Sequence, residues 1–330
     1  MERKTVGILL GDASGVGPEI VAEVAAKGFF DDKCLPIIIG DVRVFEKGLK
    51  IKDLECPHYI IDDSWEIDES KGLAVYDLND QDPEKVIMGQ VNKYCGEGDI
   101  HMLQAACKLT MDGKLSGFTY GPLHKGAMKE AGMKQESETE FMGDEFGHTG
   151  KIGEINMLGN LMTVRVTSHI PLKDVSAHLS VDNILSTIQL AYDTEVKSGN
   201  ASPRIAVSGM NPHNGESGKC GTEEIEIITP AIEEAKAKGW DVSGPYPADI
   251  VFMRAFKGEF DAVVTMYHDQ GQIALKVTGF DKGVTIGGGL PYPVTTAAHG
   301  TAFGRAGQGR ASTTAFENAV NVLCKMVNNN

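Results

Sequence analysis

Three histidines each follow a short apolar run that is typical of a buried strand: His169 after Met162–Val166, His213 after Ile205–Val207, and His268 after Ala262–Met266. The carboxyl ends of parallel strands meet at one edge of a sheet, where such folds bind ligands. Three imidazoles at that edge could hold one divalent cation and leave positions open for a substrate. The alternative is that each histidine caps a turn or binds a nearby carbonyl on its own.

A metal held by three neutral ligands keeps nearly its full positive charge. Such a metal can bind a hydroxyl oxygen together with an adjacent carbonyl or carboxylate, favour the alkoxide, and then stabilise an enolate. This pattern therefore predicts oxidation of a secondary alcohol beside a carboxylate. A metal-dependent hydrolase or lyase that uses the same histidines and a bound water is the alternative.

Glycine-rich stretches form a second group of candidate binding elements. GDASGVGPEI, residues 11–20, resembles a phosphate-cradling loop, although it is neither a G-x-G-x-x-G nor a Walker sequence and could serve packing alone. HGTAFGRAGQGRAS, residues 299–312, could bring its backbone close to a cofactor. IGGGLP, residues 286–291, is typical of a hinge or a close-approach loop.

Apolar strand-like runs alternate with helical stretches along the chain, which predicts an α/β fold with a largely parallel sheet. The predicted strands are 6–10, 36–39, 117–120, 162–166, 205–207 and 262–266. The predicted helices are 18–26, 100–111, 179–198, 223–238 and 313–327. We expect one domain from residues 1–135 plus 287–330, with the cofactor loop, and a second from 136–286, with the histidines.

Composition narrows the class of partner. The net charge of −15 argues against a nucleic-acid grip by a general basic surface, although a local pocket can still bind a small anion. The six cysteines form no C-x-x-C pair, which predicts reduced thiols in the cytoplasm. No apolar run approaches the roughly 18 residues of a membrane span, so we expect no membrane partner.

The motifs GDASGVGPEI, YGPLHKGAMKEAG, TSHIPL, GMNPHNGESGKCGTEEI, YPADIVF, YHDQGQIALK and GGGLP…HGTAF occur in this order. Together they resemble the 4-hydroxythreonine-4-phosphate dehydrogenase family over residues 4–328. The resemblance implies a two-domain α/β/α fold like that of isocitrate and isopropylmalate dehydrogenases, with the active site in the interdomain cleft. It also implies a homodimer in which each subunit completes the other's site, with the dimer interface on the 136–286 domain.

The same resemblance implies NAD or NADP as the hydride acceptor and one divalent metal ion per subunit, which could be Zn, Co, Ni, Mn or Mg. The metal ligands that it implies are His169, His213 and His268. The 299–312 loop resembles an adenosine-binding loop, so the expected cofactor contacts are His299, Gly300, Thr301, Gly307 and Gly309.

For the chemical step, the candidates are Lys276, Asp249 and Asp269. The lysine could bind a substrate anion or assist proton transfer, and the aspartates could orient metal-bound imidazoles or take the hydroxyl proton. In the reference reaction the product is a β-keto acid that then loses CO₂, and the sequence leaves that second step open here.

The substrate pocket departs from the family pattern. Thr139 matches a substrate contact, but Glu138 replaces a histidine, Thr285 replaces an asparagine and Val294 replaces an arginine among the expected substrate contacts. An arginine gives a phosphate a charge-assisted bidentate bond, and valine gives none.

We therefore expect the metal, cofactor and redox chemistry to be retained with a changed substrate. That substrate would be another phosphorylated sugar acid, an unphosphorylated hydroxy acid or a cyclic diol-carboxylate. A non-catalytic ligand-binding protein remains the other alternative.

Overall fold

The structure is a computed structural model that describes residues 3–62 and 64–329. The chain divides into two compact units. Unit 1 consists of the chain up to Thr149 together with Leu290–Asn328, and unit 2 consists of Gly150–Gly289. Residues 136–149, expected in the second domain, lie in unit 1, because helix α5 (Glu138–Glu145) packs against helix α3 (Lys93–Met111).

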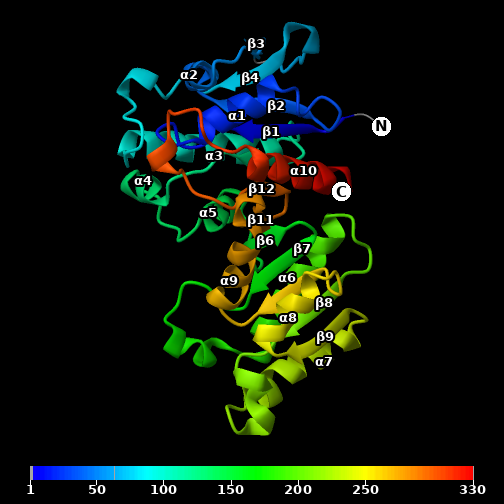
Figure 1. Cartoon of the computed structure of the whole chain (residues 1–330). Coiled ribbons are helices and arrows are strands. Elements are labelled where there is room, and N and C mark those ends of the chain that lie inside the picture. The colour runs from blue at the N-terminus through cyan, green and yellow to red at the C-terminus, as the bar shows by residue number, and fades with distance from the viewer. Residues whose placement is uncertain (1–2, 63, 330) are drawn as a thin grey trace. The chain divides into compact units, whose positions relative to one another are not determined.

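Unit 1 is built on a parallel sheet whose strands run in the order β3-β4-β2-β1-β5-β12. In Figure 1, strands β1–β5 and most of the helices of unit 1 are coloured blue to green, and helix α10 is red. The further elements of unit 1 are β1 (Thr5–Leu9), α1 (Gly17–Ala26), β2 (Leu35–Gly40), α2 (Val42–Lys52), β3 (His58–Ile60), β4 (Leu73–Asp77), β5 (Phe118–Tyr120), α4 (Lys125–Glu130), β12 (Val294–Ala297) and α10 (Thr314–Asn328).

Unit 2 is built on a mixed sheet in the order β11-β6-β7-β10-β8-β9, in which only β6 runs antiparallel to its neighbours. Its elements are β6 (Gly153–Leu158), β7 (Leu161–Arg165), α6 (Val181–Lys197), β8 (Arg204–Ser208), a π-helical turn (Glu224–Ile228), α7 (Thr229–Ala237), β9 (Asp241–Tyr246), α8 (Ala248–Ala255), β10 (Ala262–Thr265), α9 (His268–Gly279) and β11 (Val284–Gly288).

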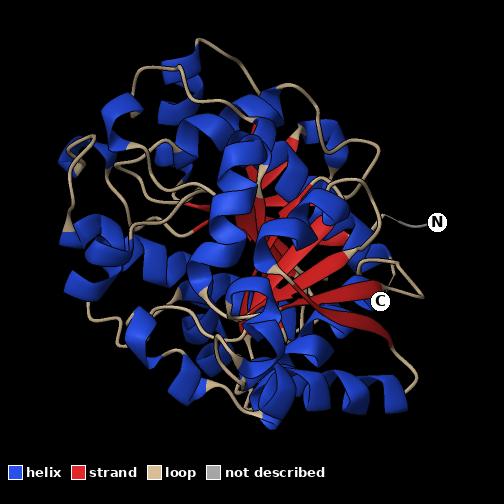
Figure 2. Ribbon diagram, turned by 60° about the horizontal axis from the view of Figure 1, so that its bottom comes forward, coloured by secondary structure: helices blue, strands red, loops and turns tan. Residues whose placement is uncertain are grey.

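The predicted α/β class is confirmed, and strands are flanked by helices in Figure 2. Each of the six predicted strands is present to within a residue, because long aliphatic runs such as 37–39 are wholly buried. The sequence missed α9, which begins at His268 directly after β10. Its polar residues had suggested the end of a strand, whereas they form the first turns of a helix.

A close backbone approach joins the carboxyl ends of β1 and β5. A Cβ atom added to Gly121 would lie 2.5 Å from the carbonyl oxygen of Leu10 and 3.1 Å from the Cα atom of Gly17. These neighbours are backbone atoms of a strand end and a helix start, so they have little freedom to retreat. The glycine lets the two loops that follow these strands come together.

We therefore expect Gly121→Ala to lower the free energy of unfolding by about 1–3 kcal/mol, the usual range for forced overpacking. Gly304→Ala is the matched control, because a Cβ atom there would meet nothing within 4 Å. Urea denaturation of both variants measures the difference. Equal stability of the two variants would show that the approach is not constrained.

Candidate active site

His169 and His268 lie next to each other in unit 2. The parallel pairing of β7 with β10 sets Val164 opposite Val264. The pairing continues past both strands, because the backbone N–H of Thr167 donates to the carbonyl of Met266 at 3.1 Å and the Thr167 hydroxyl donates to the same oxygen at 2.7 Å. Two residues beyond Thr167 and two beyond Met266, the rings of His169 and His268 have centroids 5.8 Å apart.

The side chains of α9 hold His268 in place. Nδ1 of His268 lies 2.7 Å from Oδ1 of Asp269, which leaves Nε2 as the outward-facing nitrogen. Gln270 accepts from the backbone N–H of Met266 and donates to the carbonyl of Gly209, at 2.8 Å in each case. Gln270 thereby ties the end of β10 to the end of β8, the strand that precedes His213.

His213 lies on a different kind of segment. The 212–218 turn has positive φ at His213, Asn214, Glu216 and Ser217, among other residues. The His213 side chain is 72% exposed, and its Nδ1 lies 3.1 Å from Oε1 of Glu216. Within the described residues, no group of three His, Cys, Asp or Glu side chains is close enough to hold a metal ion. The structure brings two of the three predicted ligands together, and the third is apart from them.

A buried acid that the sequence analysis did not single out anchors this turn. Glu224 is 3% exposed and accepts from the backbone N–H groups of Met210 and Asn211 at 2.8 and 2.6 Å. On the other side of the turn, the Asn214 amide donates to the carbonyl of Pro245 at 2.6 Å. The sequence contains no local signal for these contacts, because Glu224 lies well beyond the turn that it holds.

The other predicted residues of unit 2 lie around the same sheet. Asp249 is exposed in the first turn of α8, and Lys276 is in the last turn of α9. Thr285 is half-buried on β11, where its hydroxyl accepts a hydrogen bond from the Asn156 amide at 3.1 Å.

Two of the three glycine-rich stretches singled out in the sequence, residues 11–20 and 299–312, meet in unit 1. The backbone N–H of Val16 donates to the carbonyl of Thr301 at 3.1 Å, and a Cβ atom on Gly15 would lie 2.9 Å from Cβ of Thr301. The backbone N–H of Gly307 donates to Glu19 at 3.1 Å, and Lys52 donates to the carbonyl of Gly309 at 3.1 Å. His299 is half-buried beside the exposed Gly300, with its Nδ1 3.0 Å from that residue's carbonyl oxygen.

Residues at the start of α4 and α5 adjoin this loop. The His124 ring stacks on Phe303 with centroids 4.8 Å apart. Glu138 and Thr139 are 9% and 3% exposed, and Glu138 lies 3.4 Å from the Lys125 ammonium. The Lys125 charge partly neutralises the Glu138 carboxylate. Glu138 would therefore repel an anionic ligand less strongly than the sequence alone predicts. Val294 is buried in β12 and offers no donor.

Two buried carboxyl groups lie beneath these loops. Asp12 accepts from the backbone N–H and hydroxyl of Ser14 at 2.8 and 2.6 Å, which orders the first glycine loop. Asp99, on α3, is fully buried, and its Oδ1 has no hydrogen-bond partner among the described residues. Burial, aided by the charge of Asp12, raises the pKa of Asp99 well above its usual range. Asp99 could not be singled out from the sequence, because an isolated acid on a helix normally faces solvent.

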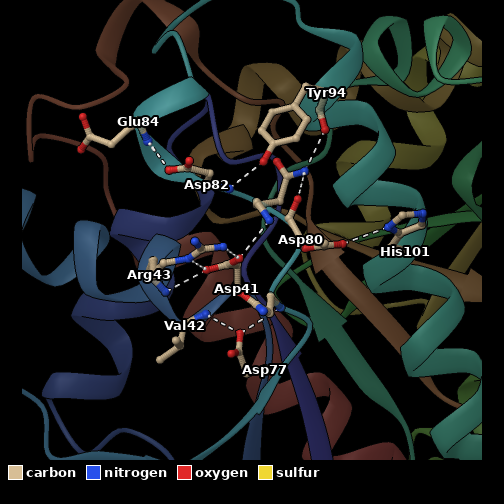
Figure 3. Close-up of polar contacts among 11 residues, drawn as sticks. Asp41, Val42, Arg43, Asp77, Asp80, Asp82, Glu84, Tyr94 and His101 are labelled. Atoms are coloured by element: carbon tan, nitrogen blue, oxygen red, sulfur yellow. Dashed lines mark hydrogen bonds and ion pairs between the residues drawn. The ribbon is translucent and has the colours of Figure 1, made fainter.

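Acidic residues that follow β2 and β4 are held by local partners, as Figure 3 shows. Asp41 caps α2 and binds the Arg43 guanidinium at 2.7 Å. Asp80 lies 2.9 Å from Nδ1 of His101 on α3. These contacts identify a structural network at this edge of the sheet.

The comparisons with known proteins identify the family of the chain. Residues 32–323 match the family model described as pyridoxal phosphate biosynthetic protein PdxA. The chain is 39% identical to 4-hydroxythreonine-4-phosphate dehydrogenase of Desulforapulum autotrophicum, over 94% of this chain and 91% of that protein. It is 38% identical to D-threonate 4-phosphate dehydrogenase of Cupriavidus necator, over 93% of this chain and 92% of that protein.

A solved structure gives the same result. The crystal structure of 4-hydroxythreonine-4-phosphate dehydrogenase from Klebsiella pneumoniae superimposes with a TM-score of 0.86, at 32% identity over 98% of each chain. Fold and comparisons together define an α/β oxidoreductase. The chain belongs to the PdxA family, as its motifs predicted.

Among the described residues, we find no helix that is both long and apolar enough to cross a membrane.

We expect Asp99→Asn to change how stability depends on pH. Asp99 keeps its proton in the folded state to a higher pH than in the unfolded state, where its pKa is about 3.9. Between those two pKa values, rising pH therefore lowers the stability of the wild type by up to about 1.4 kcal/mol per pH unit, and Asn removes this loss. Urea denaturation from acid to mildly alkaline pH should show the variant gaining stability over the wild type as pH rises. A difference that stays constant with pH would contradict the assignment.

Proposed function

We propose that this protein is a divalent-metal-dependent dehydrogenase that uses NAD or NADP to oxidise a secondary alcohol of a phosphorylated hydroxy acid. The single observation that carries the proposal is the His169–His268 pair, with Asp269 bound to Nδ1 of His268. A carboxylate on one ring nitrogen raises the basicity of the other, an arrangement typical of metal-binding histidines. The named substrates of the relatives are phosphorylated four-carbon acids, which supports the substrate class.

Two of the three histidines that would hold a divalent ion, His169 and His268, already lie together. His213, which is exposed on a separate turn, would complete the ligand set. When bound, the metal would acidify the substrate hydroxyl and polarise its neighbouring oxygen. Asp249, or Lys276 acting through water, would accept the proton of the substrate hydroxyl. The carbon that carries this hydroxyl would at the same time lose its hydride to the nicotinamide ring. Loss of CO₂ would follow only where the product is a β-keto acid.

The cofactor would lie on the loop that contains His299, Gly300, Thr301, Gly307 and Gly309. A Cβ atom on Gly300 would meet nothing within 4 Å, so the backbone there is open to a ligand. Glu138 and Thr139 would contact the substrate from the start of α5, with the Glu138 charge offset by Lys125. A cytoplasmic location, which the cysteine usage favours, is part of this proposal.

The direct test is reduction of NAD⁺ and NADP⁺ with D-threonate 4-phosphate and 4-phosphohydroxythreonine, followed by absorbance of the reduced cofactor. We expect turnover that EDTA abolishes and a divalent ion restores. Asp269→Asn should lower kcat/KM by about 10–100-fold, because it loosens the orientation of His268. His148→Gln, which changes a half-buried histidine of unit 1, is the control and should match the wild type.

Full activity in the presence of EDTA would contradict the proposed dependence of catalysis on a divalent metal. A protein that binds either phosphorylated acid but reduces neither cofactor would instead support the non-catalytic alternative.

The proposal includes a homodimer, supported by an apolar surface on unit 2. Helices α8 and α9 pack on one core cluster that contains Ala206, Val251 and Val263, with Ala274 against it. Their outward sides expose apolar pairs at helical spacing: Ile250 and Met253 at 46% and 63%, and Ile273 and Val277 at 61% and 84%. Exposure on this scale on neighbouring helices marks an interaction surface, and a second copy of this chain is the occupant that we propose.

The double variant Met253→Glu, Val277→Glu should be monomeric by light scattering, because paired carboxylates cannot be buried against an identical surface. Val196→Glu is the matched control, since Val196 on α6 is a 40% exposed apolar residue away from α8 and α9. A wild type that is monomeric at micromolar concentration would contradict the proposal.

A further inference from the structure

Two helices of unit 1 hold the C-terminal half of the proposed cofactor loop. Glu19 of α1 is 1% exposed, and its Oε2 accepts from the backbone N–H of Gly307 at 3.1 Å. Nζ of Lys52, in the last turn of α2, donates to the carbonyls of Gly309 and Ala311 at 3.1 and 3.2 Å. Side chains from both helices therefore bind the backbone of this half of the loop.

Lys52 is a buried cation whose charge is compensated locally. Its side chain is 7% exposed, and its Nζ lies 2.5 Å from Oε2 of Glu23, one turn after Glu19 on α1. Burial alone would raise the pKa of Glu23, but the hydrogen bonds from Lys27 and Lys52 lower it below its usual range. An ammonium has three N–H donors, and here they match the Glu23 carboxylate and the two loop carbonyls. A buried lysine with all its donors in use restricts the positions of its acceptors.

The tethered segment is rich in glycine and would be mobile without these contacts. Gly307 and Gly309 both have positive φ, +74° and +65°. Glycine reaches this region as readily as others, so an untethered segment would sample many conformations. A Cβ atom on Gly309 would lie 3.0 Å from the carbonyl oxygen of Ile51, so the loop backbone also lies close to the end of α2. The contacts with α1 and α2 therefore restrict a segment that its own sequence leaves free.

The rest of the loop combines a fixed point with open backbone. The bond from the Val16 N–H to the carbonyl of Thr301 holds its N-terminal half at 3.1 Å. A Cβ atom on Gly300 or on Gly304 would meet nothing within 4 Å, and the Arg305 side chain is exposed. The loop is thus held at both halves and leaves backbone free for a ligand. Fixing a binding loop in advance lowers the entropy that the ligand must overcome.

We propose that Lys52 and Glu19 are positioning residues for the cofactor, because they hold the 307–311 segment in the conformation that binds the dinucleotide. The inference rests on the proposed function and specifies how its cofactor loop is kept ready. A loop that is in its binding conformation for only a fraction of the time has an apparent Kd raised by the reciprocal of that fraction. Release of the loop therefore raises the KM for the cofactor. It leaves kcat largely unchanged, because the bound cofactor restores the same loop conformation.

A purely structural role for Lys52 predicts different behaviour. Removal of one partner from a buried ion pair destabilises a fold, because it leaves the other charge uncompensated. A loss of that kind would lower the stability of unit 1 and leave the cofactor affinity of the folded protein unchanged. Cofactor binding and local amide exchange separate the two roles without metal, substrate or turnover.

The experiment titrates the full-length wild type, Lys52→Met and Glu19→Ala with NAD⁺ and NADP⁺, and follows amide hydrogen exchange in the absence of cofactor. We expect each variant to bind the preferred cofactor roughly 10-fold more weakly, the effect of losing a hydrogen bond to a charged group. The amides of residues 305–308, all hydrogen-bonded in the wild type, should exchange faster in both variants, while those of β1 should not. Where turnover is measured, the KM for the cofactor should rise with little change in kcat.

Two further variants serve as controls. Glu19→Gln keeps an oxygen acceptor for the Gly307 N–H and should bind the cofactor as the wild type does. Lys47→Met is the matched control for Lys52→Met, because Lys47 also lies on α2 and donates to a backbone carbonyl, that of Pro83 at 3.1 Å. It should bind the cofactor with the affinity of the wild type.

The proposal is overturned if Lys52→Met binds the cofactor as tightly as Lys47→Met, or if its 305–308 amides exchange no faster than those of the wild type. If Lys52→Met does not fold, the comparison of Glu19→Ala with Glu19→Gln decides, and equal cofactor affinity in that pair also overturns it. A wild type that binds neither cofactor would contradict the proposed function instead. Faster exchange at residues 305–308 in Lys52→Met would then still show that Lys52 holds the loop.

Discussion

Parallel pairing of β7 with β10 is the constraint on which the proposed chemistry of unit 2 depends. The backbone and hydroxyl of Thr167 extend this pairing to Met266, so the residues that follow both strands leave the sheet together. His169 and His268 are brought within 5.8 Å by backbone hydrogen bonds rather than by their own contacts. The same strands also place Arg165 opposite Thr265, as the last pair before the segments that contain the histidines. The histidine pair and the buried Arg165 guanidinium thus share the same pair of strands as their support.

Unit 1 contributes a different kind of order. There the proposed cofactor-binding elements are loops, and they are held by close backbone approach together with side chains of α1 and α2. The loop after β1 contacts the loop after β5 through Gly121 and the loop after β12 through Gly15. Asp12 and Asp99 lie beneath these loops, with incomplete hydrogen bonding among the described residues. Backbone groups gathered at the carboxyl ends of adjacent parallel strands suit a nucleotide, which is recognised largely through main-chain contacts.

Sequence reasoning succeeded where the signal is local. Buried strands such as β10 are continuous apolar runs, so their positions and the histidines beyond them could be predicted. It failed where long-range contacts decide the conformation. The exposed position of His213 depends on Glu224, and the Arg165–Asn156 contact depends on the register of β6 against β7, which no single segment encodes. Lys125 beside Glu138 is a further case, because the offsetting charge comes from the preceding helix.

The most direct test of the central claim, that the β7–β10 pairing builds a metal site, is a measurement of bound metal. The wild type and the variants His169→Gln and His268→Gln would be dialysed against zinc and manganese, and the retained ion measured by mass spectrometry. The account predicts stoichiometric binding by the wild type, and a loss in each variant that His148→Gln does not share. Retention of the ion by both variants, or no ion in the wild type, would contradict it.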